Sequence, residues 1–151
     1  QQSQAVGRVP GYPPLRAVLA DVRAAQGQWA EALQTLREIV AADPNCATAW
    51  ERLAWILATS PDAQWRRANE AVRAAQQAAR LTRNQAAQPL DTLGAAYAEA
   101  GLLDKAIDAA EHALQLARRD GDEYLAAQIE ARLAGYRAGR PFRTPPPMLQ
   151  P

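Results

Sequence analysis

Apolar residues recur at intervals of three and four positions along most of the chain, and this spacing predicts amphipathic helices. Leu15, Val18, Leu19 and Val22 follow it in a first helix over residues 15–26. The same period predicts a second helix over 29–42, a third over about 45–58, a fourth over 60–81, and three more that contain residues 90–97, 106–114 and 125–136. The pattern therefore predicts an all-α protein.

Residues that favour turns and caps separate these helices. Gly27 suits a turn that requires a left-handed backbone, which glycine adopts most easily. Asp43-Pro44 ends the second helix, and Asn45 is expected to cap the third helix through its side chain. Residues 60–62, Ser-Pro-Asp, are expected to begin the fourth helix, because they combine a capping oxygen, a first-turn proline and an acid near the positive end of the dipole.

The helices follow an internal repeat. Residues 27–33, Gly-Gln-Trp-Ala-Glu-Ala-Leu, return as Gly-Leu-Leu-Asp-Lys-Ala-Ile at 101–107. Upstream of each copy, and once between them, an apolar helix carries a small residue at its middle. These small residues are Ala20, Ala54 and Gly94. The step from Ala20 to Ala54 is 34 residues, which is the period of the two-helix tetratricopeptide repeat. The expected architecture is three helix pairs and a C-terminal capping helix, stacked as a right-handed α-α superhelix.

The second helix pair has a longer connection than the other two. The small residues of paired helices are 12 positions apart in the first and third pairs, but Ala54 and Ala71 are 17 apart. Five extra residues are therefore expected within residues 60–67, and Trp65 lies among them. Close packing is expected between Ala20 and Ala32, Ala54 and Ala71, and Gly94 and Ala106.

Two phrases resemble a bacterial subclass of tetratricopeptide repeat proteins. They are Ala-Thr-Ser-Pro-Asp at 58–62 and Leu-Asp-Thr-Leu-Gly-Ala-Ala-Tyr-Ala-Glu-Ala-Gly at 90–101. In that subclass a Trp-containing helix, an insertion opening Ser-Pro-Asp and an Asp-Thr-Leu helix follow in this order. Residues 129–143, which end Gly-Arg-Pro-Phe-Arg, resemble the way such arrays terminate. The resemblance covers about residues 15–143 and implies the tetratricopeptide fold; the subclass includes free-standing proteins and tails of larger membrane and glycosyltransferase-like proteins.

The expected organisation has three parts. Residues 1–14 form an extended arm rich in proline and glycine, residues 15–140 the repeat domain, and residues 141–151 a proline-rich tail. Within the domain, the repeats are expected at about 15–45, 46–84 and 86–120, with the capping helix at 122–138. Arg16 and Arg23 occupy the positions that would face a preceding repeat. Their polarity predicts an array that begins here, since terminal repeats need a polar outer face.

Composition and charge exclude several classes of function. The net charge of +1, from 17 basic and 16 acidic residues, lacks the clustered basic face that nucleic-acid binding requires. No run of about 18 apolar residues exists, so no direct membrane insertion is expected. Cys46 is the single cysteine, which leaves an exported and a cytoplasmic location equally open. His112 is the only histidine, and no cysteine–histidine cluster, phosphate-binding glycine loop or nucleophile elbow accompanies it. No catalytic residue, cofactor or metal site is predicted.

The candidate site is a groove on the concave side of the array. Its predicted residues are Asp21, Glu51, Trp55, Asp91 and Glu99, which fall on the inner helix of each pair. Trp55 is a candidate anchor, because tryptophan is enriched among the residues that dominate binding energy. The alternative interpretation is that Trp55 packs on the neighbouring helix and donates its indole N–H to Asp91. With Arg52 as the only cation counted, the groove is expected to be mildly acidic and to suit a basic segment.

The function predicted from these features is protein–protein interaction, as an adaptor or assembly subunit without catalytic activity. The expected partner is a protein or peptide, with an apolar anchor beside a positive charge. A different class of function is structural: self-association or packing in a larger assembly through the proline-rich arms. A third alternative is the recognition tail of a glycosyltransferase-like protein.

Overall fold

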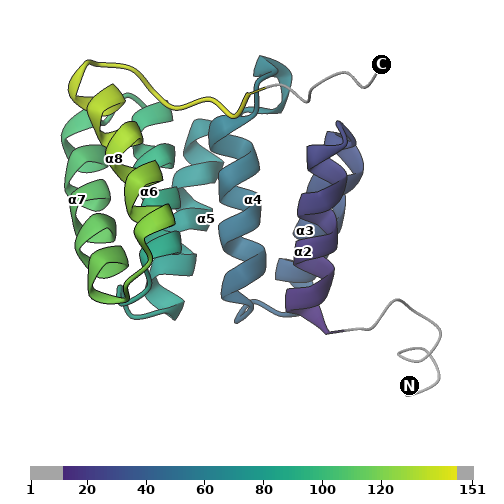
Figure 1. Ribbon diagram of the computed structural model, residues 1–151. Helices are drawn as coiled ribbons and strands as arrows, with labels where there is room; N and C mark the ends of the chain where they lie inside the picture. Colours follow the sequence, from purple (N-terminus) through teal and green to yellow (C-terminus); the bar gives the residue numbers. More distant parts are fainter. Residues whose placement is uncertain (1–11, 146–151) are drawn as a thin grey trace, which may run out of the picture.

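The computed structural model describes residues 12–145, and all regular secondary structure in this part of the chain is helical, with no β-strand. Its α-helices are α2 (Pro13–Ala25), α3 (Trp29–Ala42), α4 (Ala47–Thr59), α5 (Ala68–Leu81), α6 (Ala87–Glu99), α7 (Leu103–Arg119) and α8 (Glu123–Arg137), and a short 3₁₀ helix, η1 (Ala63–Trp65), lies between α4 and α5. Neighbouring helices run antiparallel and stack in sequence order from α2 to α8 (Figure 1). The predicted seven-helix α-α superhelical fold is therefore confirmed.

Alanine-rich seams let the paired helices approach closely. Ala20, Ala54 and Ala106 are no more than 1% exposed. A Cβ atom placed on Gly94 of α6 would lie 3.2 Å from the carbonyl oxygen of Ala106 on α7. A side chain at that position would be tight against the backbone of the next helix. The core is thus built by small side chains and near backbone contact, as expected from the recurring small residues.

The turns within the first and third pairs share one geometry. Gly27 and Gly101 adopt φ of 83° and 80°, a left-handed conformation that strains other residues. In both turns the amide after the glycine donates back to a carbonyl in the last helical turn: Gln28 to Arg23, and Leu102 to Tyr97. This arrangement satisfies carbonyls that the helix end leaves free. It explains why the phrase containing these glycines repeats in the sequence.

Three sequence expectations about helix starts are wrong. Pro13 and Pro14 belong to the first turn of α2 rather than to the arm, because a proline there forfeits no helical hydrogen bond. Asn45 does not cap α4: its amide donates to Asp43 Oδ1, and no side chain caps that helix. Residues 60–62 do not begin α5. Instead, Asp62 caps η1 by accepting from the amide of Gln64, and the extra residues 60–67 form the connection to α5.

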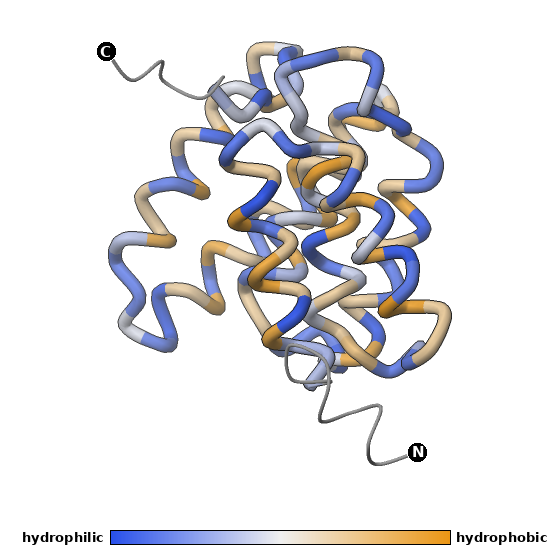
Figure 2. The backbone as a smooth tube through the Cα atoms, turned by 90° about the vertical axis from the view of Figure 1, so that its right-hand side faces the viewer, coloured by the Kyte–Doolittle hydropathy of each residue, from blue (hydrophilic) through white to orange (hydrophobic). Residues whose placement is uncertain are grey.

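The exposed face of α2 carries large apolar side chains beside Arg16 and Arg23, the two residues from which a polar outer face was predicted. The buried residues of α2 are Ala17, Ala20 and Ala24. The larger apolar residues of the same helix remain on the surface. They are Leu15, Val18, Leu19 and Val22, which are 38–48% exposed. Figure 2, which views the molecule from the side of α2 and α3, shows hydrophobic and hydrophilic segments alternating along the helices. The first helix pair therefore exposes a helical stripe of large apolar side chains.

The last helix covers the end of the array. Ile129, Leu133 and Tyr136 of α8 are at most 4% exposed, and Leu125 is half-buried. These are the four positions predicted to form the inner face of the capping helix. After α8 the chain turns back, and the segment that follows runs across one end of the helices toward α4 and η1 (Figure 1). Residues 1–11 and 146–151, where most of the predicted arm and part of the tail fall, lie outside the described residues.

Candidate partner-binding surface

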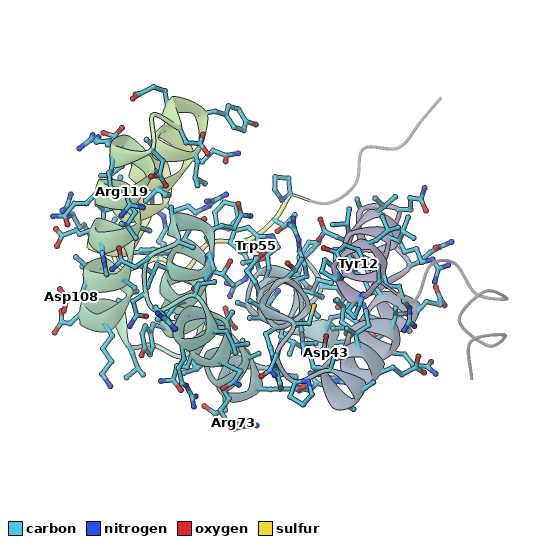
Figure 3. All side chains as sticks on the ribbon, turned by 90° about the horizontal axis from the view of Figure 1, so that it is seen from below. Tyr12, Asp43, Trp55, Arg73, Asp108 and Arg119 are labelled. Atoms are coloured by element: carbon cyan, nitrogen blue, oxygen red, sulfur yellow. The ribbon has the colours of Figure 1, made fainter. Side chains whose placement is uncertain are left out.

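The inner helices α2, α4 and α6 supply all five residues predicted for the groove. Asp21 comes from α2, Glu51 and Trp55 from α4, and Asp91 and Glu99 from α6. In Figure 3, Trp55 lies near the centre of the array, beside the C-terminal segment, whereas Arg73 and Asp108 project from the outer side. The structure thus gathers these side chains on one side of the stack, where each acid has an arginine beside it.

Asp21 and Glu51 share Arg52. The Nη1 atom of Arg52 lies 3.5 Å from Asp21 Oδ2, and its Nε atom lies 3.6 Å from Glu51 Oε1. Glu51 is 5% exposed and also accepts a 2.8 Å hydrogen bond from the Thr92 hydroxyl on α6. Burial raises the pKa of Glu51 to about 7, although Arg52 and the Thr92 hydrogen bond act in the opposite direction. Glu51 therefore ties α4 to α6 and titrates near neutral pH.

Asp91 pairs with an arginine that sequence analysis did not include in the groove. Arg132 of α8 donates a short hydrogen bond to Asp91 Oδ2, and Asp91 is 3% exposed. Burial raises the pKa of Asp91 to about 6, against the lowering effect of Arg132. The carboxylate is therefore mainly ionised at neutral pH, and its ion pair joins α8 to α6 beneath the groove surface.

The guanidinium of Arg132 also contacts two aromatic rings that touch each other. Its central carbon is 4.8 Å from the ring centroid of Trp55 and 4.8 Å from that of Phe142. The two rings themselves are 5.6 Å apart, with their planes inclined by 35°. The two cation–ring distances are typical of attractive cation–π pairs, and the ring–ring distance is typical of an attractive aromatic pair. Trp55 is therefore packed by residues from α8 and from the segment after it.

Glu99 lies between two further arginines. Arg143 Nη1 is 2.6 Å from Glu99 Oε1, and Arg66 Nε, from the connection before α5, is 3.5 Å from Glu99 Oε2. The Glu99 side chain is only 16% exposed, whereas that of Arg143 is 36% exposed. The carboxylate is thus a fixed feature of the groove, and the arginine from the C-terminal segment reaches it from the surface.

The C-terminal segment also makes a main-chain contact with the groove. The amide of Thr144 donates a 2.7 Å hydrogen bond to the carbonyl of Thr59, the last residue of α4. The hydroxyl groups of the same two threonines are 2.9 Å apart. Residues 141–145 have no regular secondary structure, and they cross one end of the helices toward α4 and η1 (Figure 1). We call this stretch the return segment.

Sequence reasoning placed the five candidate residues on the inner helices but did not identify their ion-pair partners. The alternative in which Trp55 donates to Asp91 is wrong in its donor, because Arg132 makes that contact. The groove was expected to be mildly acidic because Arg52 was the only cation counted among its residues. The cations that sequence reasoning omitted are Arg66, Arg132 and Arg143. The Gly-Arg-Pro-Phe-Arg ending had been noted as a family feature, and it was the one signal that pointed to the return segment.

Within residues 12–145, no three metal-ligating side chains cluster. No helix in this range is long and apolar enough to cross a membrane. Cys46 is buried at the start of α4.

Comparison with known families supports the repeat architecture. The tetratricopeptide repeat family model matches residues 3–56, which include α2, α3 and most of α4. No curated protein matches the chain. Residues 3–56 are therefore similar to a tetratricopeptide repeat, and the helix pairs of residues 12–145 have the α-α superhelical fold of tetratricopeptide repeat proteins.

Proposed function

We propose that this protein is a non-catalytic interaction module, an adaptor or assembly subunit, whose concave groove binds a segment of a protein partner. Tetratricopeptide repeats generally mediate protein–protein interaction, and stacked helical repeats use extended concave surfaces for binding. The groove around Asp21, Glu51, Trp55, Asp91 and Glu99 is such a surface.

The observation that carries this proposal is that the groove already accommodates an extended stretch of chain. The return segment contacts it through an aromatic ring, a cation and a main-chain amide. These three contacts come from Phe142, Arg143 and Thr144. The groove therefore offers the contacts of a peptide-binding surface: a tryptophan platform, a fixed carboxylate and a free carbonyl at a helix end.

The test compares two tryptophan variants. Trp55→Ala removes the groove platform, and Trp29→Ala removes a half-buried tryptophan on α3 as the matched control. Partners that co-purify with the intact protein are identified, and the Kd of each variant for them is measured by calorimetry alongside its melting temperature. Trp55→Ala should weaken binding by about 2 kcal/mol, roughly 30-fold, while Trp29→Ala binds like the wild type. Equal binding by both variants would place the partner elsewhere.

A second candidate function is self-association or packing in a larger assembly. The exposed stripe on α2 favours it, because Leu15, Val18, Leu19 and Val22 present contiguous apolar surface at helical spacing. This surface replaces the proline-rich arms as the candidate contact. Arg16 and Arg23 lie on the same helix, so a packing partner with acidic residues beside an apolar stripe fits best.

Sedimentation velocity over a range of concentrations distinguishes this candidate. Leu19→Glu places a charge in the stripe, and Tyr124→Glu, at an exposed aromatic residue of α8, is the control. If the stripe mediates assembly, Leu19→Glu alone should reduce the sedimentation coefficient at high concentration. A monomer at every concentration, for the wild type and both variants, would reject self-association.

A further inference from the structure

The return segment, residues 141–145, makes the contacts that the groove's chemistry requires of a partner. We propose that it is an intramolecular ligand of the groove, and that the partner is a polypeptide segment with an aromatic residue followed by arginine or lysine, which competes with it. This inference rests on the proposed function and specifies the chemistry of its partner.

The aromatic half of the recognition is built into the helices. Trp55 of α4 and Arg132 of α8 form one side of the stack, and Phe142 forms the other. Arg132 is held by Asp91, a buried residue of α6. The platform is therefore fixed by three helices, and Phe142 is the component supplied from outside them.

The cationic half follows directly along the chain. Arg143 is the residue after Phe142, and its guanidinium reaches Glu99 at 2.6 Å. Glu99 keeps Arg66 at 3.5 Å on its other side, so one cation on Glu99 belongs to the domain and one to the segment. A competing segment therefore needs a positive charge directly after its aromatic residue.

The main-chain contact makes the site suited to any extended polypeptide. The carbonyl of Thr59 lies at the C-terminal end of α4, where helical hydrogen bonding stops. It accepts from the Thr144 amide, which every residue except proline can offer at that position. Pairing an extended backbone with a free acceptor adds affinity without adding sequence selectivity, and the selectivity comes from the aromatic and cationic positions.

The groove residues are more deeply buried than the residues of the return segment, as expected of a binding site and its ligand. With the return segment in place, the groove side is buried: Thr59 is 1% exposed and Asp91 is 3% exposed. The return segment has no regular secondary structure, its residues from Pro141 to Thr144 are half-buried, and Pro145 is exposed. Gly139, with φ of 83°, forms the turn that directs the segment back from α8. Phe142 packs against the edge of the hydrophobic core, whereas the rest of the segment crosses the surface without regular secondary structure.

The proposal is tested with a fluorescent peptide that has the sequence of residues 140–147, added to the full chain. Three proteins are compared: the wild type, Phe142→Ala/Arg143→Ala, and the control Arg140→Ala, whose side chain is exposed and precedes the contacts. Anisotropy should show at least tenfold tighter binding to the double variant than to the other two. In the wild type and the control, the return segment occupies the site in most molecules. Added peptide can bind only the fraction of molecules in which the site is open, so its apparent affinity is lower by that fraction.

Peptide variants check the recognition rule. Replacing the peptide's phenylalanine by alanine, or its following arginine by glutamate, should abolish binding to the double variant. Equal affinity of all three proteins, or binding that ignores both peptide changes, would overturn the proposal. If the double variant does not fold, the wild type is titrated with excess peptide and observed by NMR. The Thr144 amide and the Trp55 indole resonances should then shift together, and a Thr144 amide that stays unchanged at saturation would also overturn it.

These outcomes are separable from the proposed function. Peptide binding depends only on the groove and its return segment, whereas the function depends on a native partner that requires Trp55. A native partner lost in Trp55→Ala, together with no peptide effect, rejects competition and retains the interaction module. If the peptide binds as predicted but no native partner depends on Trp55, the intramolecular contact is retained and the proposed interaction function is rejected.

Discussion

Two glycines in helix interiors provide a sharp test of how the repeat packs. Gly94 lies in the middle of α6, and Gly135 lies in α8, two residues before its end. A Cβ atom on Gly94 would meet the Ala106 carbonyl oxygen at 3.2 Å and the Ala110 amide nitrogen at 3.6 Å. On Gly135 it would meet only the carbonyl of Arg140, at an ordinary contact distance of 3.8 Å. The same substitution to alanine therefore faces opposite packing conditions.

The two alanine substitutions should change the free energy of unfolding in opposite directions. Alanine in place of glycine stabilises a helix interior by about 1 kcal/mol. At Gly135 nothing opposes this gain, so Gly135→Ala should raise the free energy of unfolding by about 0.5–1 kcal/mol, the lower value reflecting its place in the last turn. At Gly94 the obstacle is backbone of α7, which cannot rotate away, and overpacking costs about 1–3 kcal/mol. Gly94→Ala should therefore lower the free energy of unfolding by up to about 2 kcal/mol.

Urea unfolding followed by circular dichroism measures both free energies, and thermal melts provide a second reading. For a domain of this size, each kcal/mol shifts the melting temperature by about 3–5 °C. Gly94→Leu should be far more destabilising than Gly94→Ala, because α7 cannot accommodate three further carbon atoms. If Gly94→Ala is as stabilising as Gly135→Ala, then α6 and α7 do not approach as closely as this reasoning requires.

Two further predictions concern the groove and the capping helix. Because Glu51 has a folded pKa of about 7, above its ordinary 4.5, its protonated form stabilises the fold fully below pH 4.5, and this stabilisation disappears as the pH rises through 7. The free energy of unfolding of the wild type should therefore fall by up to about 3 kcal/mol between pH 5 and pH 8. Urea melts repeated across that range should show a flatter pH dependence for Glu51→Gln. An unchanged slope would contradict the assignment of this pH dependence to Glu51. A chain ending at Asp120 lacks α8, exposes the apolar surface that Ile129 and Leu133 cover, and removes Arg132 from Asp91. It should aggregate or unfold without cooperativity in size-exclusion chromatography and thermal melts, and an unchanged monomeric melt would show that α8 has another role.

Local periodicity was enough to predict the helices. The range predicted for the second helix, residues 29–42, coincides with α3, because four apolar residues at helical spacing are bounded by clear turn signals. Helix starts were less predictable. Asn45 and Ser60 are good capping residues, yet neither caps an α-helix here: Asn45 gives its amide to Asp43, and the Ser60 hydroxyl donates to the carbonyl of Ile56. Each capping group has several local partners, and only the path of the chain selects among them.

In the candidate groove too, one part could be predicted from the sequence and another could not. Its inner-helix residues, such as Trp55 and Glu99, could be located because a regular repeat fixes which helix faces are concave. Their charge partners could not, since Arg132 and Arg143 reach them from α8 and from an irregular segment whose direction no period encodes. The stripe on α2 is a second example: periodicity identified Leu15 to Val22 as one helical set, but it did not determine that the alanines would be buried instead.

By itself, the sequence determined the helical class, the 34-residue repeat and the small-residue seams, because these depend on spacing along one chain. Only the tertiary structure decided which arginine neutralises each acid, which large side chains of α2 remain exposed, and where residues 141–145 lie. Those features are long-range contacts between parts with independent local patterns. Their free energies depend on distance and burial in the assembled array, and neither quantity exists until the helices have packed.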